Sequence, residues 1–143
     1  MKVVINNKHG GFSLSHEGVM HYAKIKGIEL YPEMNQQYPS LKMYTYWTCP
    51  PDQRPKVLTD QEFYAANDAE RKASNEAYGK NTIYCRDIPR NDAALVQTVE
   101  EMGEAANGRH AYLKIVEIPD DVEWEIDEYD GLEWVAEVHR TWS

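Results

Sequence analysis

Residues 122–142 constrain the fold of this chain more than any other segment. On both sides of Asp130-Gly131, apolar side chains alternate with polar or acidic ones, a period of two that is typical of a half-buried strand. Two such runs joined at an Asp-Gly pair predict an antiparallel β-hairpin. A helix through the second run is the competing interpretation, because apolar residues from Leu132 onward also recur at helical spacing.

The apolar faces of the two runs favour one register. A two-residue Asp-Gly turn would place Trp124 opposite Glu137 and mix apolar with acidic side chains. A three-residue loop pairs Trp124 with Ala136 instead, so that the apolar faces of both runs coincide. We therefore expect a three-residue loop with Gly131 in the left-handed region. In this register five acidic residues share one face of the hairpin: Glu123, Glu125, Asp127, Glu133 and Glu137.

Negative charge is concentrated in the same segment. The 143-residue chain has 24 acidic residues against 15 Lys and Arg, a formal net charge of -9. Ten of these acidic residues lie between Glu117 and Glu137, where there is no Lys or Arg, so the rest of the chain is nearly neutral. This charge excludes a protein that binds nucleic-acid backbones through clustered positive residues.

The five acidic residues of that face are the candidate partner-binding site. The face would suit a basic protein partner, mimicry of a nucleic acid or a cation, and the alternative is a solvated face that discourages edge-to-edge aggregation. We assign no metal, because alternate acids on a flat strand do not converge. The two cysteines and five histidines show no metal-ligand spacing, and no cofactor or catalytic residue is assigned.

The remaining segments predict an α/β fold, with α+β as the alternative. Apolar or β-rich runs predict strands at Lys2–Asn6, Ile28–Tyr31, Thr82–Arg86 and Ala111–Ile118. Capping residues predict helices that begin after Ser15, after Thr59 (running to about Tyr78) and after Asn91 or Asp92. We expect a single domain over residues 1–143, with a mixed sheet, flanking helices and the C-terminal hairpin. The proline-interrupted stretch 32–80 is expected to be an insertion within it.

Two strand-to-helix connections form the candidate ligand site. If the strands Lys2–Asn6 and Thr82–Arg86 run parallel in one sheet, both connections emerge at the carboxyl end, where α/β folds bind ligands. Glycines allow a ligand to approach the backbone, and the helix after Ser15 offers amide donors to an anion. The candidate residues are Asn6, Lys8, Gly10, Gly11, Ser13, Ser15, Asp87, Arg90 and Asn91. The alternative is that the glycines form a turn and the polar residues cap helices.

Several motifs stand out as a set: residues 1–6 with Gly10-Gly11-Phe12 and Leu14-Ser15, residues 87–97, residues 113–124, and Tyr129-Asp130-Gly131 with Trp134 and residues 139–142. Together they resemble a family of small, mostly uncharacterised phage and prophage proteins. The likeness spans about residues 1–31 and 81–142. It implies a phage accessory gene product. Such products often interfere with host defence by binding a defence protein or by sequestering a nucleotide signal.

These observations predict a non-catalytic binding protein that acts on a host system. Its partner would be a host defence protein, held by the acidic face, or a small nucleotide, held by the two loops. A small nucleotide-directed hydrolase or transferase at the same loops is the alternative from another class. The sequence has no signal-peptide core and no run of 18 apolar residues, so we expect the host cytoplasm rather than a membrane. The oligomeric state stays open, with a homo-oligomer as one option.

Overall fold

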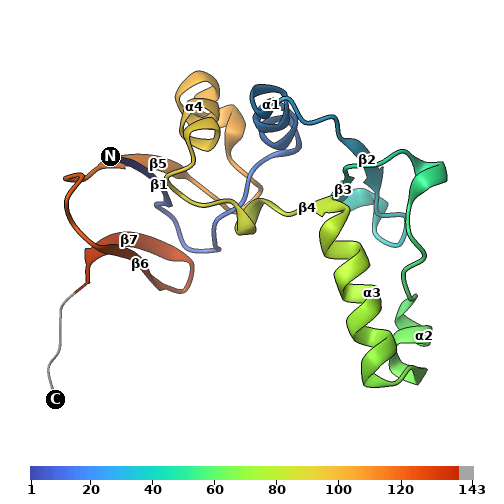
Figure 1. Cartoon of the computed structure of the whole chain (residues 1–143). Coiled ribbons are helices and arrows are strands. Elements are labelled where there is room, and N and C mark those ends of the chain that lie inside the picture. The colour runs from blue at the N-terminus through green and yellow to red at the C-terminus, as the bar shows by residue number, and fades with distance from the viewer. Residues whose placement is uncertain (139–143) are drawn as a thin grey trace, which may run out of the picture. The chain divides into compact units, whose positions relative to one another are not determined.

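The computed structural model describes residues 1–138, which divide into two compact units (Figure 1). The first unit comprises residues 1–27 and the described residues from Cys85 onward. The second comprises Ile28–Tyr84 and so contains the whole of the 32–80 stretch. Helices and strands together form an α+β fold, the alternative to the α/β fold in the sequence prediction, with the predicted antiparallel hairpin near its C-terminal end.

The core of the first unit lies between a two-stranded sheet and two helices. Strand β1 (Lys2–Asn6) pairs antiparallel with β5 (Leu113–Glu117), and helices α1 (His16–Lys26) and α4 (Ala93–Met102) contact each other (Figure 1). Helix α4 also packs on both strands. Val3 and Val4 are fully buried, so this predicted apolar strand is covered on both faces.

Local capping signals set the ends of both helices. The Ser15 hydroxyl accepts a hydrogen bond from the Gly18 amide, which confirms the predicted helix start. Gly27 ends α1 in the left-handed conformation. The Asp92 carboxylate accepts from the amides of Ala94 and Leu95 and so starts α4. Helix α4 ends at Met102 and continues as a 3-10 turn, Gly103–Ala106.

The pKa of Asp92 reflects these contacts. Burial alone would raise it, but the Lys26 ammonium 2.9 Å away and the amides of Leu95 and Ala94 outweigh burial and hold the pKa below its usual value. The deprotonated form is therefore stabilised in the folded chain. Its contribution to stability is complete above the pKa of an unfolded aspartate, about 4, and is lost as the pH falls through the folded-state pKa.

Asp92→Ala is expected to lower the free energy of unfolding by about 1–2 kcal/mol at neutral pH, because it removes the cap and the Lys26 partner. Urea unfolding at a series of pH values would measure this. The wild-type chain should lose more stability than the variant as the pH falls below about 4. Asp92→Asn is the control, since it keeps a capping oxygen and removes the titrating charge together with its ion pair to Lys26. Parallel pH profiles for wild type and Asp92→Asn would contradict the assignment.

The C-terminal hairpin consists of β6 (Trp124–Tyr129) and β7 (Leu132–Glu137). The predicted hairpin is confirmed, but the predicted three-residue loop and its register are wrong. Trp124 pairs with Glu137 and Tyr129 with Leu132, so the turn has two residues. Asp130 and Gly131 have φ values of 49° and 83°, the positive pair that a type I′ turn requires. A type I′ turn matches the twist of the strands. This preference outweighs the preference for keeping apolar and acidic side chains on separate faces.

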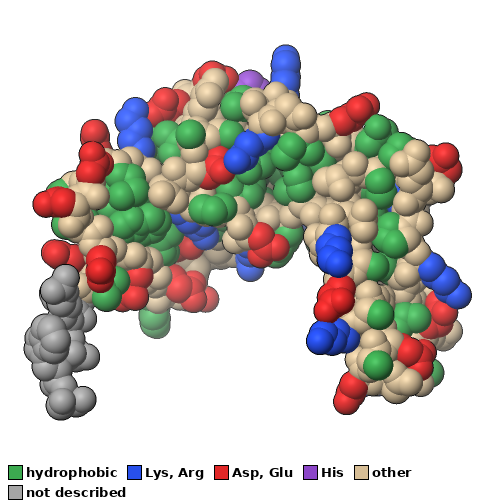
Figure 2. Space-filling model, in the orientation of Figure 1, with side chains coloured by type: hydrophobic (Ala, Val, Ile, Leu, Met, Phe, Trp, Pro, Cys, Tyr) green, Lys and Arg blue, Asp and Glu red, His purple; other side chains and the backbone are tan. Residues whose placement is uncertain are grey.

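The observed register redistributes the acidic residues. A shift of one residue moves every side chain of β7 to the other face relative to β6. Glu133 and Glu137 therefore share a face with Trp124 and Ile126, and the predicted single acidic face does not form. Glu123, Glu125 and Asp127 lie on the opposite face. Acidic side chains interspersed with apolar ones are visible over the hairpin region in Figure 2.

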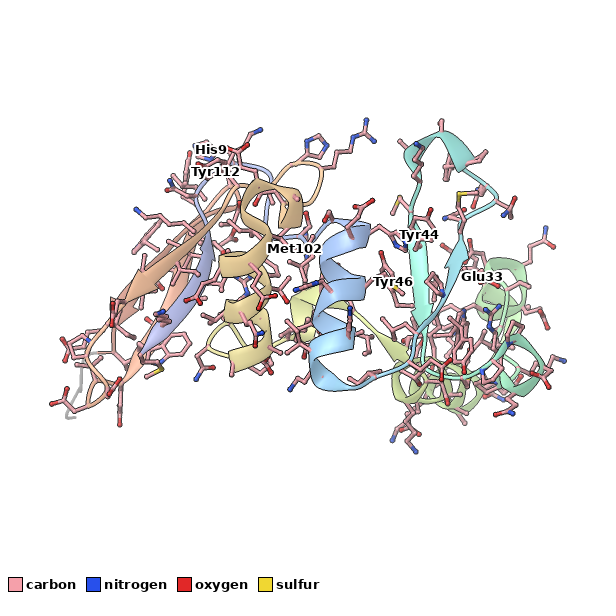
Figure 3. The ribbon with its side chains drawn as sticks, turned by 90° about the horizontal axis from the view of Figure 1, so that it is seen from above. His9, Glu33, Tyr44, Tyr46, Met102 and Tyr112 are labelled. Atoms are coloured by element: carbon pink, nitrogen blue, oxygen red, sulfur yellow. The ribbon has the colours of Figure 1, made fainter. Side chains whose placement is uncertain are left out.

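The second unit has its own small antiparallel sheet, in the order β2 (Tyr31–Met34), β3 (Tyr44–Trp47) and β4 (Thr82–Ile83). Tyr44 and Tyr46 extend from the same side of β3, with ring centroids 6.1 Å apart (Figure 3). Trp47 is the buried centre of this unit. The second predicted strand begins later than expected, at Tyr31 rather than Ile28.

Two sequence predictions fail in or next to this unit. The helix expected from Thr59 to Tyr78 is two helices, α2 (Asp60–Ala65) and α3 (Asp68–Lys80). The Thr59 capping box forms, but Asn67 supplies a second cap by accepting from the Glu70 amide. The strand expected over Thr82–Arg86 ends at Ile83, and Cys85–Asp87 is a 3-10 turn.

The predicted ligand site depended on a strand over Thr82–Arg86 that runs parallel to Lys2–Asn6 in one sheet. The structure does not contain this arrangement. Strand β4 pairs with β3 of the second unit and not with β1. All strand ladders among residues 1–138 are antiparallel, so the mixed sheet is wrong. The connection from Asp87 to Asp92 nevertheless reaches β1, because the Val4 amide donates to the Arg90 carbonyl at 2.8 Å.

Candidate functional site

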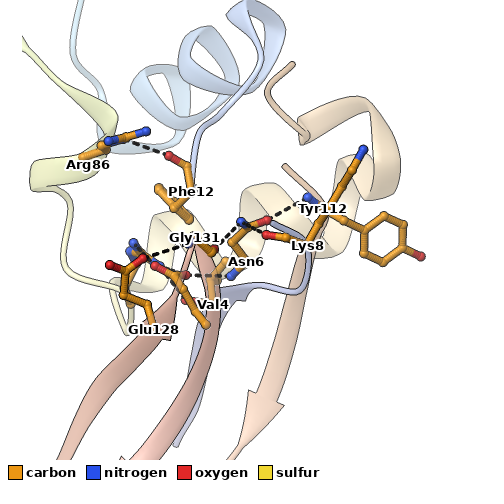
Figure 4. Close-up of polar contacts among 10 residues, drawn as sticks. Val4, Asn6, Lys8, Phe12, Arg86, Tyr112, Glu128 and Gly131 are labelled. Atoms are coloured by element: carbon orange, nitrogen blue, oxygen red, sulfur yellow. Dashed lines mark hydrogen bonds and ion pairs between the residues drawn. The ribbon is translucent and has the colours of Figure 1, made fainter. Parts of the chain in front are cut away.

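Asn6, at the end of β1, joins three segments of the first unit. Its fully buried side chain donates to the carbonyls of Lys8 and Gly131, at 2.6 and 2.7 Å, and accepts from the Tyr112 amide at 2.8 Å (Figure 4). The buried amide groups of Asn6 are thus all used internally. Asn6 therefore holds the loop after β1, the start of β5 and the hairpin turn together.

An ion pair between Arg90 and Glu133 lies along the edge of β1 that does not pair with β5. The Arg90 guanidinium donates to both oxygens of Glu133, at 2.6 and 2.9 Å, and lies 3.6 Å from the centroid of the Phe12 ring. Glu133 also accepts from the Asn6 amide at 2.7 Å. The two side chains are only 16% and 9% exposed. Glu133, predicted as a partner-binding residue, is therefore bound within the unit, because the register turns it toward β1.

The predicted glycine loop packs against the hairpin turn. The Gly10 amide donates to the Asp130 carbonyl at 3.1 Å. A Cβ atom on Gly131 would lie 2.2 Å from the Gly11 nitrogen, and one on Gly10 would lie 2.8 Å from the His110 carbonyl oxygen. Gly10 and Gly11 do allow a close backbone approach, as the sequence predicts. The group that approaches is the chain's own turn.

The other predicted ligand residues are dispersed around this junction. Ser15 caps α1 and donates to the Ala105 carbonyl, and the carbonyl of Ser13 accepts from Gly108. Asp87 and Lys8 are exposed. Asn91 lines a shallow groove beside Met1 and Lys2. The structure thus brings Asn6, Gly10, Gly11 and Arg90 together, but around the hairpin rather than an open cradle.

The outward face of the hairpin, defined as the face that carries Glu123, Glu125, Asp127, Tyr129, Leu132, Trp134, Ala136 and Val138, is the exposed acidic surface. Tyr129 is 73% exposed and Trp134 is 45% exposed. Asp127 lies directly opposite Trp134. Within residues 1–138, Glu123, Glu125 and Asp127 have no ion-pair partner. Glu137 is exposed on the other face.

Tyr129 and Trp134 are the site residues that sequence reasoning missed. The alternation predicts that Trp134 shares the apolar face of Trp124 and Ile126, and the structure shows that this register is wrong. The Asp-Gly pair was the available signal, since it favours a two-residue type I′ turn. With that turn, Trp134 necessarily shares a face with Asp127.

The described residues contain neither a cluster of metal ligands nor a membrane-spanning helix. Within residues 1–138, no three His, Cys, Asp or Glu side chains gather as metal ligands would. No helix in the described part of the chain is both long and apolar enough to cross a membrane. Residues 139–142, which complete the motif that begins at Tyr129, lie outside the described residues.

No protein-family model, curated protein or solved structure matches this chain. The candidate site therefore rests on its own geometry.

Proposed function

We propose that this chain is a non-catalytic binding protein whose outward hairpin face docks on a basic protein. The observation that carries the proposal is the combination on that face of three carboxylates, Glu123, Glu125 and Asp127, with the exposed rings of Tyr129 and Trp134. Exposed aromatic residues are the usual anchors of protein interfaces, and surrounding charge selects the partner and speeds association.

The hydrogen bonds that hold the hairpin on the first unit support this function. Asn6, Glu133 and the Gly10 amide fix the turn and the inner face of the hairpin to the first unit. A pre-organised surface loses less conformational entropy on binding than a mobile one. The same seating argues against a small nucleotide at Gly10 and Gly11, because the turn backbone already packs there.

The resemblance of the sequence to phage and prophage proteins suggests the biological setting of this proposal. The partner would be a host protein, such as a component of a defence system, and the chain would act in the host cytoplasm. A homo-oligomer is compatible with a single docking face per chain. A nucleotide-directed hydrolase or transferase is the outcome that would replace the proposal.

Reversing the charge of Glu123, Glu125 and Asp127 to lysine is expected to reduce capture of a host protein at least tenfold, because both attraction and complementarity are lost. The measurement is quantitative mass spectrometry of proteins that co-purify from host cells with each tagged variant. The control reverses Asp52, Glu76 and Glu104, which are exposed elsewhere and change net charge equally. Equal loss in both variants, or conversion of a nucleotide by the purified chain, would refute the proposal.

A further inference from the structure

Three arginines within this chain share one mode of contact. Arg90 lies 3.6 Å from the centroid of the Phe12 ring and pairs with Glu133. Arg54 lies 5.1 Å from the Trp47 ring and pairs with Glu33. Arg71 lies 5.4 Å from the Phe63 ring and pairs with Asp68 at 3.7 Å. In each case one guanidinium contacts both an aromatic ring and a carboxylate.

The outward hairpin face carries the same two groups, an aromatic ring and a carboxylate. No guanidinium from residues 1–138 lies over its Trp134 ring. Asp127 and Trp134 are directly opposite in the ladder, a position that brings Cβ atoms within about 5.5 Å. Glu125 is the diagonal neighbour of Trp134, and its own partner in the ladder is the small Ala136. The ring is 45% exposed, whereas Trp47 is 4% exposed.

We propose that Trp134, Asp127 and Glu125 form a receptor for an arginine side chain of the partner. The inference rests on the proposed function, since it names the group that the acidic face receives. A guanidinium is planar, stacks on an aromatic ring and can donate two parallel hydrogen bonds to a carboxylate. A lysine ammonium is a compact, strongly hydrated charge and stacks less well. The face should therefore distinguish arginine from lysine at equal charge.

Hexa-arginine and hexalysine peptides are the probes, with binding to the full chain measured by isothermal titration calorimetry. The wild-type chain should bind hexa-arginine about three- to tenfold more tightly than hexalysine, as a ring-guanidinium contact predicts. Trp134→Leu should abolish this preference and change hexalysine binding less than about twofold. Asp127→Asn should weaken the binding of both peptides. Tyr64→Leu, which removes an exposed ring in the second unit, should leave the preference unchanged.

Several outcomes would overturn the arginine receptor. Equal affinity of the wild-type chain for the two peptides, or a preference that survives Trp134→Leu, excludes a stacked guanidinium at this ring. If both peptides bind equally and the triple lysine variant binds neither, the docking face stands and the receptor does not. If neither peptide binds the wild-type chain, the receptor is excluded and the co-purification experiment alone decides the proposed function. Circular dichroism and urea unfolding of Trp134→Leu confirm that the variant is folded.

Discussion

Replacing Arg90 with leucine is expected to lower the free energy of unfolding by about 3–5 kcal/mol, as for other buried ion pairs that lose one partner. The substitution leaves the Glu133 carboxylate unpaired although its side chain is only 9% exposed. It also removes the guanidinium from the Phe12 ring and from the Val4 carbonyl. Urea unfolding followed by circular dichroism measures the change.

Two further variants keep this prediction decisive if Arg90→Leu alone unfolds the chain. Arg90→Lys retains the charge and loses the two-point geometry and the stacking, so its loss should be smaller. Arg90→Leu combined with Glu133→Gln should be more stable than Arg90→Leu alone, because the second change removes the unpaired charge and keeps an acceptor for the Asn6 amide. Equal stability of the single and double variants would show that Glu133 reaches solvent and does not depend on Arg90.

Gly131→Ala is expected to destabilise the chain by about 3 kcal/mol, the sum of left-handed strain and overpacking. Its φ is +83°, and the new Cβ would lie 2.2 Å from the Gly11 nitrogen and 2.8 Å from two Gly10 backbone atoms. Because these neighbours are backbone, the turn and the Gly10-Gly11 loop would have to separate. Hydrogen exchange should then accelerate at the Asn6 and Gly10 amides, which donate to the hairpin.

Gly27→Ala is the matched control for this substitution. Gly27 has a φ of +73°, and nothing lies within 4 Å of an added Cβ. It should therefore show only the cost of the left-handed conformation, about 1–2 kcal/mol. Similar losses of stability in the two variants would mean that the hairpin does not pack tightly on the glycine loop.

Local sequence signals predicted much of the secondary structure. The apolar run Val3-Val4-Ile5 predicted a strand, and Ser15, Thr59 and Asp92 predicted three helix starts. Each of these features is decided by groups within a few residues of one another. Asn67 was the exception, because a strong first cap at Thr59 obscured a second cap within the same polar run.

The partners of the elements were harder to predict. A strand-like run at Thr82 carries no information about which sheet it joins, and β4 pairs with β3 rather than with β1. The hairpin register depended on two conflicting signals. The alternation of faces favoured a three-residue loop, whereas Asp130-Gly131 favoured a two-residue turn, and the turn prevailed.

The candidate site shows the same division between local and long-range information. The sequence by itself determined that a hairpin would carry most of the net negative charge, and that Gly10 and Gly11 would follow the first strand. Only the tertiary structure decided that the turn of that hairpin fills the glycine loop and that Glu133 pairs with Arg90. The reason is physical: these contacts join residues 43 or more positions apart, through shape and charge that appear only after the chain has folded. What remains exposed for a partner is Trp134 with the carboxylates beside it.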